Sequence, residues 1–266
     1  MTIKQYIEEY ISDGFTDAQA RSLTAQQIIL LKIAGSTYAD KVLLKGGVVM
    51  HNITKEQRRS TIDLDFDFVR FDIRNIQNIK RFINTIDKSV PQYHVRLCGK
   101  IEDLHHQDYK GKRVKIIISD ETESLKFKMD IGVHTLFAIN QEKMCFSFGG
   151  GNELFLFVNP PEQMFAEKLF SLAKIGTISE RFKDIDDMYY LIKNKVLNIN
   201  IVRKCLELIT IPNPYGMECA FDVTQRAEES LDSNFFAQNY LNSGGTWLHI
   251  DFDEAKRVIL NFIHRL

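Results

Sequence analysis

The chain has 266 residues, of which 44% are hydrophobic and 26% are charged, the balance of a folded globular protein rather than a disordered or fibrous one. Lysine and arginine number 34 against 35 aspartates and glutamates, so the net charge of −1 excludes a protein that coats nucleic acid or an anionic membrane. No apolar run approaches the roughly 20 residues that cross a bilayer, and we expect no membrane contact.

The amino-terminal residues and the cysteines favour a cytoplasmic protein. Lys4, Glu8 and Glu9 lie where an export signal would be apolar. Widely spaced cysteines, with no pair at zinc-ligand spacing, predict reduced and mostly buried thiols at Cys98, Cys145, Cys205 and Cys219.

The first predicted elements are a long helix and a short strand. Apolar residues recur at helical spacing over residues 15–38, and Asp17 could cap the start of that helix. An apolar run at residues 42–44 ends in Gly46-Gly47. This pattern predicts a buried strand that turns abruptly into a loop or the start of a helix.

The next segment predicts a strand with one acidic face. Residues 62–68 alternate strictly between apolar residues and aspartates, and a period of two places the aspartates together on one face: Asp63, Asp65 and Asp67. Residues 75–88 then predict an amphipathic helix. Further strands are expected at residues 93–98, 114–119 and 125–133.

The character of the chain changes near Asn159. Residues 144–148 and 153–158 flank three consecutive glycines and predict a hairpin. Beyond it the pattern predicts helices that begin at Pro161 and that cover residues 179–193, 199–210 and 253–264. We therefore predict an α+β fold, with a mixed sheet and flanking helices over residues 1–159 and a helical lobe over residues 160–266.

Asp63 and Asp65 could hold a divalent cation. Residues two apart on a strand lie about 6.6–6.8 Å apart at Cα, so their carboxylates can converge on one ion. A site for Mg²⁺ and a nucleotide uses few carboxylates together with phosphate oxygens, which the Gly46-Gly47 junction could help to bind. The alternative is a solvated strand face, although three like charges on one face usually need neutralisation by a metal, Lys or Arg.

Four ordered segments carry a family resemblance. Lys45-Gly46-Gly47 followed by Arg59-x-Thr61-x-Asp63-Leu64-Asp65-Phe66 resembles motif I of the nucleotidyltransferase superfamily, in the form used by the AbiEii/AbiGii toxin family. Three later segments resemble that family's second, third and fourth motifs: Phe127-Lys128-Met129-Asp130-Ile131, Val158-x-x-Pro161-Glu162-x-x-x-Ala166-Glu167-Lys168-Leu169, and Arg181-x-Lys183-Asp184-x-x-Asp187-Met188-Tyr189.

The resemblance implies a polymerase-β-like, Mg²⁺-dependent enzyme that transfers a nucleoside monophosphate from an NTP to an acceptor hydroxyl. It implies metal ligands at Asp63, Asp65 and Asp130, and catalytic roles for these three together with Lys168 and Asp184. Asp130 would be a metal ligand or a base toward the acceptor. Nucleotide contacts would come from Lys45, Gly46, Gly47, Arg59, Thr61, Lys168 and Asp187. Without the motifs, Lys168, Asp184 and Asp187 would be solvated helix residues.

One departure concerns the phosphate loop. Many nucleotidyltransferases have serine where this chain has Gly47, so the resemblance implies the loss of a hydroxyl contact to the triphosphate. Backbone amides could still bind the phosphates.

The resemblance also implies partners. Relatives act as toxins of bacterial toxin–antitoxin pairs, which implies a cognate antitoxin, a tRNA 3′ end as acceptor and a nucleotide cleft between the two lobes. Scattered basic residues could form the local patch that an RNA needs: Lys55, Arg58, Arg59, Lys110, Lys112, Arg113, Lys115, Arg181 and Lys183. The residues leave open nucleotidylation of a protein or of a small molecule such as an aminoglycoside, and a non-catalytic protein that binds nucleotide or RNA.

Overall fold

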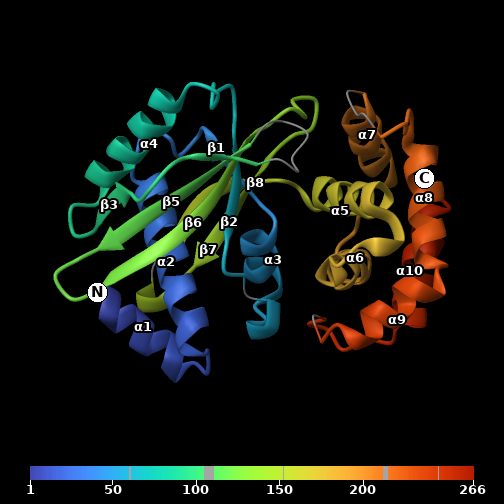
Figure 1. Ribbon diagram of the computed structural model, residues 1–266, viewed down its shortest axis with the longest axis horizontal. Helices are drawn as coiled ribbons and strands as arrows, with labels where there is room; N and C mark the ends of the chain where they lie inside the picture. Colours follow the sequence, from blue (N-terminus) through green and yellow to red (C-terminus); the bar gives the residue numbers. More distant parts are fainter. Residues whose placement is uncertain (60, 105–110, 152, 212–214, 245) are drawn as a thin grey trace. The chain divides into compact units, whose positions relative to one another are not determined.

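The structure is a computed structural model that describes residues 1–59, 61–104, 111–151, 153–211, 215–244 and 246–266 (Figure 1). The chain divides into two compact units. The first, here the sheet unit, comprises Met1–Thr135 and Gln141–Asn159, and the second, the helical unit, comprises Leu136–Asn140 and Pro160–Leu266.

The sheet unit is built on a mixed sheet of eight strands among the described residues, in the order β3-β5-β6-β2-β1-β8-β7, with β4 paired to β5 (Figure 1). Strand β2 runs antiparallel to β1 and parallel to β6. The mixed sheet of the predicted fold is therefore confirmed. The strands are β1 Val42–Lys45, β2 Leu64–Phe68, β3 His94–Leu97, β4 Glu102–Asp103, β5 Lys112–Ser119, β6 Ser124–Val133, β7 Glu142–Ser147 and β8 Glu153–Val158.

Four α-helices accompany this sheet in the described residues: α1 Ile3–Ser12, α2 Asp17–Ala34, α3 Gly47–Thr54 and α4 Ile76–Ser89. The predicted cap of α2 at Asp17 is wrong. Thr16 caps the helix, because its side chain accepts a hydrogen bond from the Gln19 amide while Gln19 bonds back to the Thr16 amide. Asp17 instead forms an ion pair with Arg21. The sequence pattern had not predicted α1.

The sheet has one apolar face and one charged face around β2. Phe66 and Phe68 are fully buried, and both rings pack on Phe82 of α4. Helix α2 contacts α4 and strands β6 and β8. Because side chains alternate along a strand, the aspartates of β2 face away from this aromatic core. The packing therefore fixes which side of the sheet carries the acidic row.

The helical unit contains six α-helices in the described residues: α5 Pro161–Ile175, α6 Phe182–Asn194, α7 Ile199–Thr210, α8 Ala220–Leu231, α9 Asn234–Asn242 and α10 Phe252–Ile263. Helix α5 packs on α6, α7 and α8, and its Phe165 ring contacts Phe262 of α10. The predicted helix at residues 179–193 begins later, at Phe182. Helices α8 and α9 were not predicted. Within the described residues, no helix combines the length and hydropathy that a membrane span requires.

Candidate active site

Charged residues form a row across four strands of the sheet unit. The strand register pairs Lys45 with Asp65, Asp65 with Asp130, and Asp130 with Arg113. Directly opposite residues share a sheet face, with Cβ atoms about 4.5–5.5 Å apart in antiparallel pairs. Asp65 and Asp130 are therefore neighbours on the face that also carries Asp63.

Three of the aspartates on this face are held by cations of the protein itself. Lys128 Nζ lies 2.9 Å from Asp63 Oδ1. The Arg113 guanidinium donates two hydrogen bonds to Asp130, from Nε to Oδ1 at 2.8 Å and from Nη2 to Oδ2 at 2.7 Å. Lys45 Nζ lies 2.7 Å from Asp67 Oδ1 in a buried pair. The acidic row is thus neutralised by Lys and Arg.

The donor set fits a magnesium ion, because carboxylate oxygens are the hard ligands that Mg²⁺ prefers. Asp65 of β2 is the register partner of Asp130, whereas Asp63 lies in the bend just before β2 and not on the strand itself. In the described part of the chain, however, no three His, Cys, Asp or Glu side chains are grouped closely enough to hold a metal ion. Lys128 and Arg113 instead contact two of these carboxylates, Asp63 and Asp130.

The two glycines of the junction permit close approach by the residues of motif I. Gly46 has a φ of +67°, and a Cβ there would lie 2.8 Å from Asp65 Oδ2. A Cβ on Gly47 would lie 2.7 Å from the Cβ of Thr61 and 2.8 Å from its Oγ1. Thr61 therefore fills the space that a serine side chain at position 47 would need, and it brings a hydroxyl to the start of α3.

A residue that sequence reasoning missed holds the segment before β2. Gln26 of α2 is buried, and its Nε2 lies 2.5 Å from the Thr61 carbonyl oxygen and 3.4 Å from that of Asp63. Arg59, which the motif assigned to nucleotide binding, is also buried. Gln26 is followed by a second glutamine, Gln27, in the same helix, so its polarity alone did not single it out.

A second charged cluster lies in the helical unit. Lys168 of α5 is buried, with its Nζ 2.6 Å from Asp184 Oδ1 and 2.7 Å from Asp187 Oδ2 on α6. Arg181 Nε donates to the other oxygen of Asp184 at 2.6 Å. Burial opposes ionisation of Asp184, but the charges of Lys168 and Arg181 lower its pKa to about 2. The structure therefore brings together the site residues predicted from the third and fourth motifs.

Sequence reasoning missed the groups that anchor this cluster. Trp247 donates its indole N–H to Asp187 at 3.0 Å and its backbone N–H to Asp186 at 2.6 Å. The Tyr240 hydroxyl also donates to Asp186, at 2.7 Å, and burial together with that carboxylate raises the pKa of Tyr240. Nothing in the sequence indicated these donors, because they come from Tyr240 and Trp247, more than 50 residues later in the chain.

Only some of the residues predicted to form a basic patch lie together in the structure. Arg113 and Lys115 of β5 share the charged face of the sheet, whereas Arg181 and Lys183 belong to the helical unit. Lys110 lies outside the described residues, as does the side chain of Arg58. The same sheet face gains two cations that sequence reasoning had not assigned to the patch, Lys126 and Lys128.

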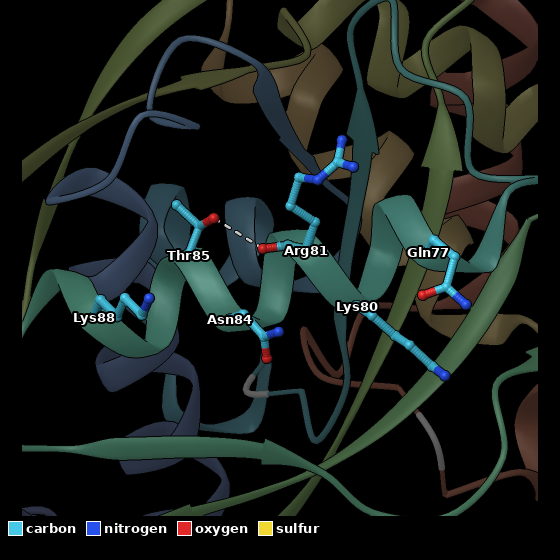
Figure 2. Close-up of a pocket in the computed structure, with 6 residues that line it drawn as sticks. All are labelled: Gln77, Lys80, Arg81, Asn84, Thr85 and Lys88. Carbon is cyan, nitrogen blue, oxygen red and sulfur yellow. Dashed lines mark hydrogen bonds between the residues drawn. The ribbon is translucent and has the colours of Figure 1, made fainter.

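A further group of cations lies on α4. Gln77, Lys80, Arg81, Asn84, Thr85 and Lys88 line an open hollow of about 450 Å³ along that helix (Figure 2). The opposite face of α4 carries Phe82, which packs on the aromatic core. This hollow therefore lies on the other side of the sheet from Asp63 and Asp65, and none of the predicted site residues lines it.

Two solved structures share this fold. JHP933 from Helicobacter pylori is 15% identical, with a TM-score of 0.51 over 95% of this chain and 93% of that one. A second H. pylori protein, described provisionally as a nucleotidyltransferase, is 14% identical with a TM-score of 0.50 over 94% and 95%. Identities this low establish a shared fold alone. The curated proteins contain no match to the chain.

The family follows from the sequence match together with the motifs. Residues 28–213 match the family described as nucleotidyl transferase AbiEii toxin, type IV TA system. The match spans both charged clusters, from α2 to the end of α7. The predicted family and its enzymatic class are thereby confirmed: the chain belongs to the AbiEii nucleotidyltransferase toxins of type IV toxin–antitoxin systems.

Proposed function

We propose that this chain transfers a nucleoside monophosphate from an NTP to a hydroxyl of RNA, with Asp63, Asp65 and Asp130 as the ligands of Mg²⁺. The observation that supports the proposal best is the register of β2 with β6, which makes Asp65 and Asp130 neighbours beside the Gly46-Gly47 junction. When bound, magnesium would neutralise the phosphate oxygens and favour departure of pyrophosphate.

The protein groups around the carboxylates would bind and orient the triphosphate. Helix α3 begins at Gly47, so its first backbone N–H groups have no carbonyl partner within the helix and can donate to a phosphate. The Thr61 hydroxyl, which fills the space beside Gly47, would add a side-chain donor. Gln26 would keep Thr61 and Asp63 in place by holding their backbone carbonyls.

The roles of Lys168, Asp184 and Asp187 remain predictions. Asp184 and Asp187 both lie within ion-pair distance of Lys168 Nζ, so the ammonium group has a fixed position in the helical unit. A fixed ammonium group is suited to a phosphate oxygen, because little freedom is lost when the contact forms.

An RNA acceptor is favoured by the cations on the charged face of the sheet. Lys115 and Lys126 lie on the same face as the acidic row, where they could contact phosphodiesters of the acceptor. The tRNA 3′ end is the acceptor that we propose, and the family implies an antitoxin as the partner that restrains the activity.

Label transfer tests the proposed activity. The purified chain would be incubated with Mg²⁺, each α-labelled NTP in turn, and total RNA or total cell protein, beside the Asp63→Ala/Asp65→Ala variant. We expect label on RNA of tRNA size with the intact chain alone. Label on protein would replace the proposed acceptor by a polypeptide, and the absence of label with every NTP and both acceptors would contradict RNA transfer.

The proposed RNA face can be tested separately. We expect Lys115→Gln/Lys126→Gln to weaken RNA binding and to reduce its salt dependence, since each phosphate contact releases counter-ions. The matched control is Lys80→Gln/Lys88→Gln on α4, which removes the same charge from the other side of the sheet (Figure 2). A larger loss in the α4 variant, measured by fluorescence anisotropy over a range of salt concentrations, would move the RNA contact to α4.

A further inference from the structure

We infer that Lys128 is an exchangeable counter-ion: it neutralises Asp63 while no divalent cation is bound, and it contacts the phosphate oxygens of the nucleotide once Asp63 binds metal. The inference rests on the proposed function, because it assigns Lys128 a role in the same site. The second motif contains Lys128, but the family resemblance implies no role for it.

The ion pair between Lys128 and Asp63 can separate at little cost in free energy. The two side chains make one contact, at 2.9 Å, and they are 39% and 32% exposed. An exposed ion pair of this kind contributes little stability, because water solvates both partners when they separate. Asp63 Oδ1 itself is covered and forms no hydrogen bond among the described residues, but the side chain as a whole is 32% exposed, so Asp63 can exchange its counter-ion without becoming a fully buried charge.

The neighbouring ion pairs are more buried or have more hydrogen bonds, so they separate less readily. Arg113 binds both oxygens of Asp130 through two hydrogen bonds, and the Asp130 side chain is only 12% exposed. Lys45 and Asp67 are 12% and 6% exposed, so separating them would bury unpaired charge. Lys128 is therefore the cation of this row that can leave its carboxylate most readily.

The surroundings of Lys128 favour a phosphate as its second partner. Lys115 is its direct register partner on β5, and like charges in directly opposite positions repel. Lys115 pairs with the exposed Glu102, and Lys126 on the same face has no ion pair among the described residues. Once Asp63 is engaged elsewhere, Lys128 needs an anion, and a phosphate oxygen supplies one within reach of the carboxylates.

The test compares metal binding with nucleotide binding in Lys128→Met. Mn²⁺ binding without nucleotide, followed by electron paramagnetic resonance, should become about two- to fivefold tighter, because the competing ammonium group is gone. Binding of α,β-methylene NTP analogues at saturating Mn²⁺ should become weaker by a similar factor. A purely structural role for Lys128 would not move the two affinities in opposite directions.

The matched control is Lys126→Met, which removes the same charge from the same strand face at a lysine that makes no ion pair with the described residues. It should change the Mn²⁺ affinity less than Lys128→Met does, and equal shifts would overturn the inference. An unchanged or weaker Mn²⁺ affinity in Lys128→Met would overturn it as well, while leaving the proposed function intact. If the unmodified chain bound no Mn²⁺, or if Asp63→Asn/Asp65→Asn bound it equally well, the proposed metal site would fail too.

Discussion

The two charged clusters of this chain differ in burial and in how many partners each charge has. On the sheet, Asp63 and Lys128 make one contact, and both side chains are about one-third exposed. In the helical unit, Lys168 contacts two carboxylates, and the three side chains are between 0% and 10% exposed. The same pairing of lysine with aspartate therefore produces an open contact between Lys128 and Asp63 and a closed network around Lys168.

The difference shows what each cluster can do. Exposed ion pairs open at little cost, so the sheet cluster can exchange a lysine for a metal or a phosphate. Removing one partner of a buried ion pair lowers the free energy of unfolding strongly, because no solvent stabilises the charge that remains. The helical cluster is therefore suited to hold Lys168 in a fixed position.

The largest expected effect concerns the function of the sheet cluster. Asp65→Asn keeps the shape of the side chain but removes one charged ligand, and we expect nucleotidyl transfer to fall at least about a hundredfold. The free energy of unfolding should stay within about 0.5 kcal/mol of the original value, since the substitution relieves repulsion from Asp130. Label incorporation and urea unfolding check the two parts. If Asp65→Asn lost stability together with activity, the sheet cluster would be as important for stability as the helical cluster, which would contradict the contrast between them.

The next effect concerns pH and the helical cluster. The folded pKa of Asp184 is lowered from 3.8 to about 2, so its stabilising effect is present above about pH 4 and is lost as the pH falls from 3.8 toward 2. The shift corresponds to about 2 kcal/mol. Asp184→Asn should therefore show a shallower loss of unfolding free energy between pH 5 and pH 3. Asp232→Asn, at a more exposed ion pair with Lys256, is the matched control for the loss of one carboxylate.

A similar effect is expected where Thr61 packs on Gly47. Gly47→Ser would place a side chain within 2.7 Å of Thr61, and overpacking of this kind costs about 1–3 kcal/mol. The double variant Gly47→Ser/Thr61→Gly removes the clash, so the two substitutions should not be additive. Unfolding free energies of both single variants and the double variant give the coupling. Simple additivity would contradict the packing described here.

The smallest effect concerns the indole that anchors α6. Trp247→Phe keeps an aromatic ring but removes the N–H that donates to Asp187, and we expect a loss of about 1.5 kcal/mol for this bond to a charged group. Tyr240→Phe removes the hydroxyl that donates to Asp186, and its loss of unfolding free energy is compared with that of Trp247→Phe. If Trp247→Phe left the unfolding free energy unchanged, the indole N–H would contribute nothing to holding Asp187.

Much of the sheet unit could be predicted from local sequence periodicity. Strict alternation predicted a strand over residues 62–68, and β2 covers Leu64–Phe68, so the common face of Asp65 and Asp67 followed from the period of two while Asp63 lies in the bend before the strand. The pairing of Asp65 with Asp130 could not follow from periodicity, since the register of strands far apart in sequence depends on tertiary packing. Arg113 and Lys128 were therefore unassigned as counter-ions of the acidic row.

The helical unit was harder to predict beyond α7. Helices α8 and α9 carry no motif, and Trp247 lies in an irregular segment after α9. Its role depends on contacts with Asp186 and Asp187, about 60 residues earlier in the chain. Such long-range hydrogen bonds leave no local pattern, whereas the capped amphipathic helix at residues 199–210 is described by local pattern alone.

Urea unfolding of Lys128→Met and Lys168→Met, measured side by side, tests the contrast between the two clusters most directly. Both substitutions remove one ammonium group and keep an unbranched side chain. We expect a change within about 0.5 kcal/mol for Lys128→Met and a loss of about 3 kcal/mol or more for Lys168→Met. Equal losses of unfolding free energy in the two variants would contradict the division into an exchangeable and a fixed cluster.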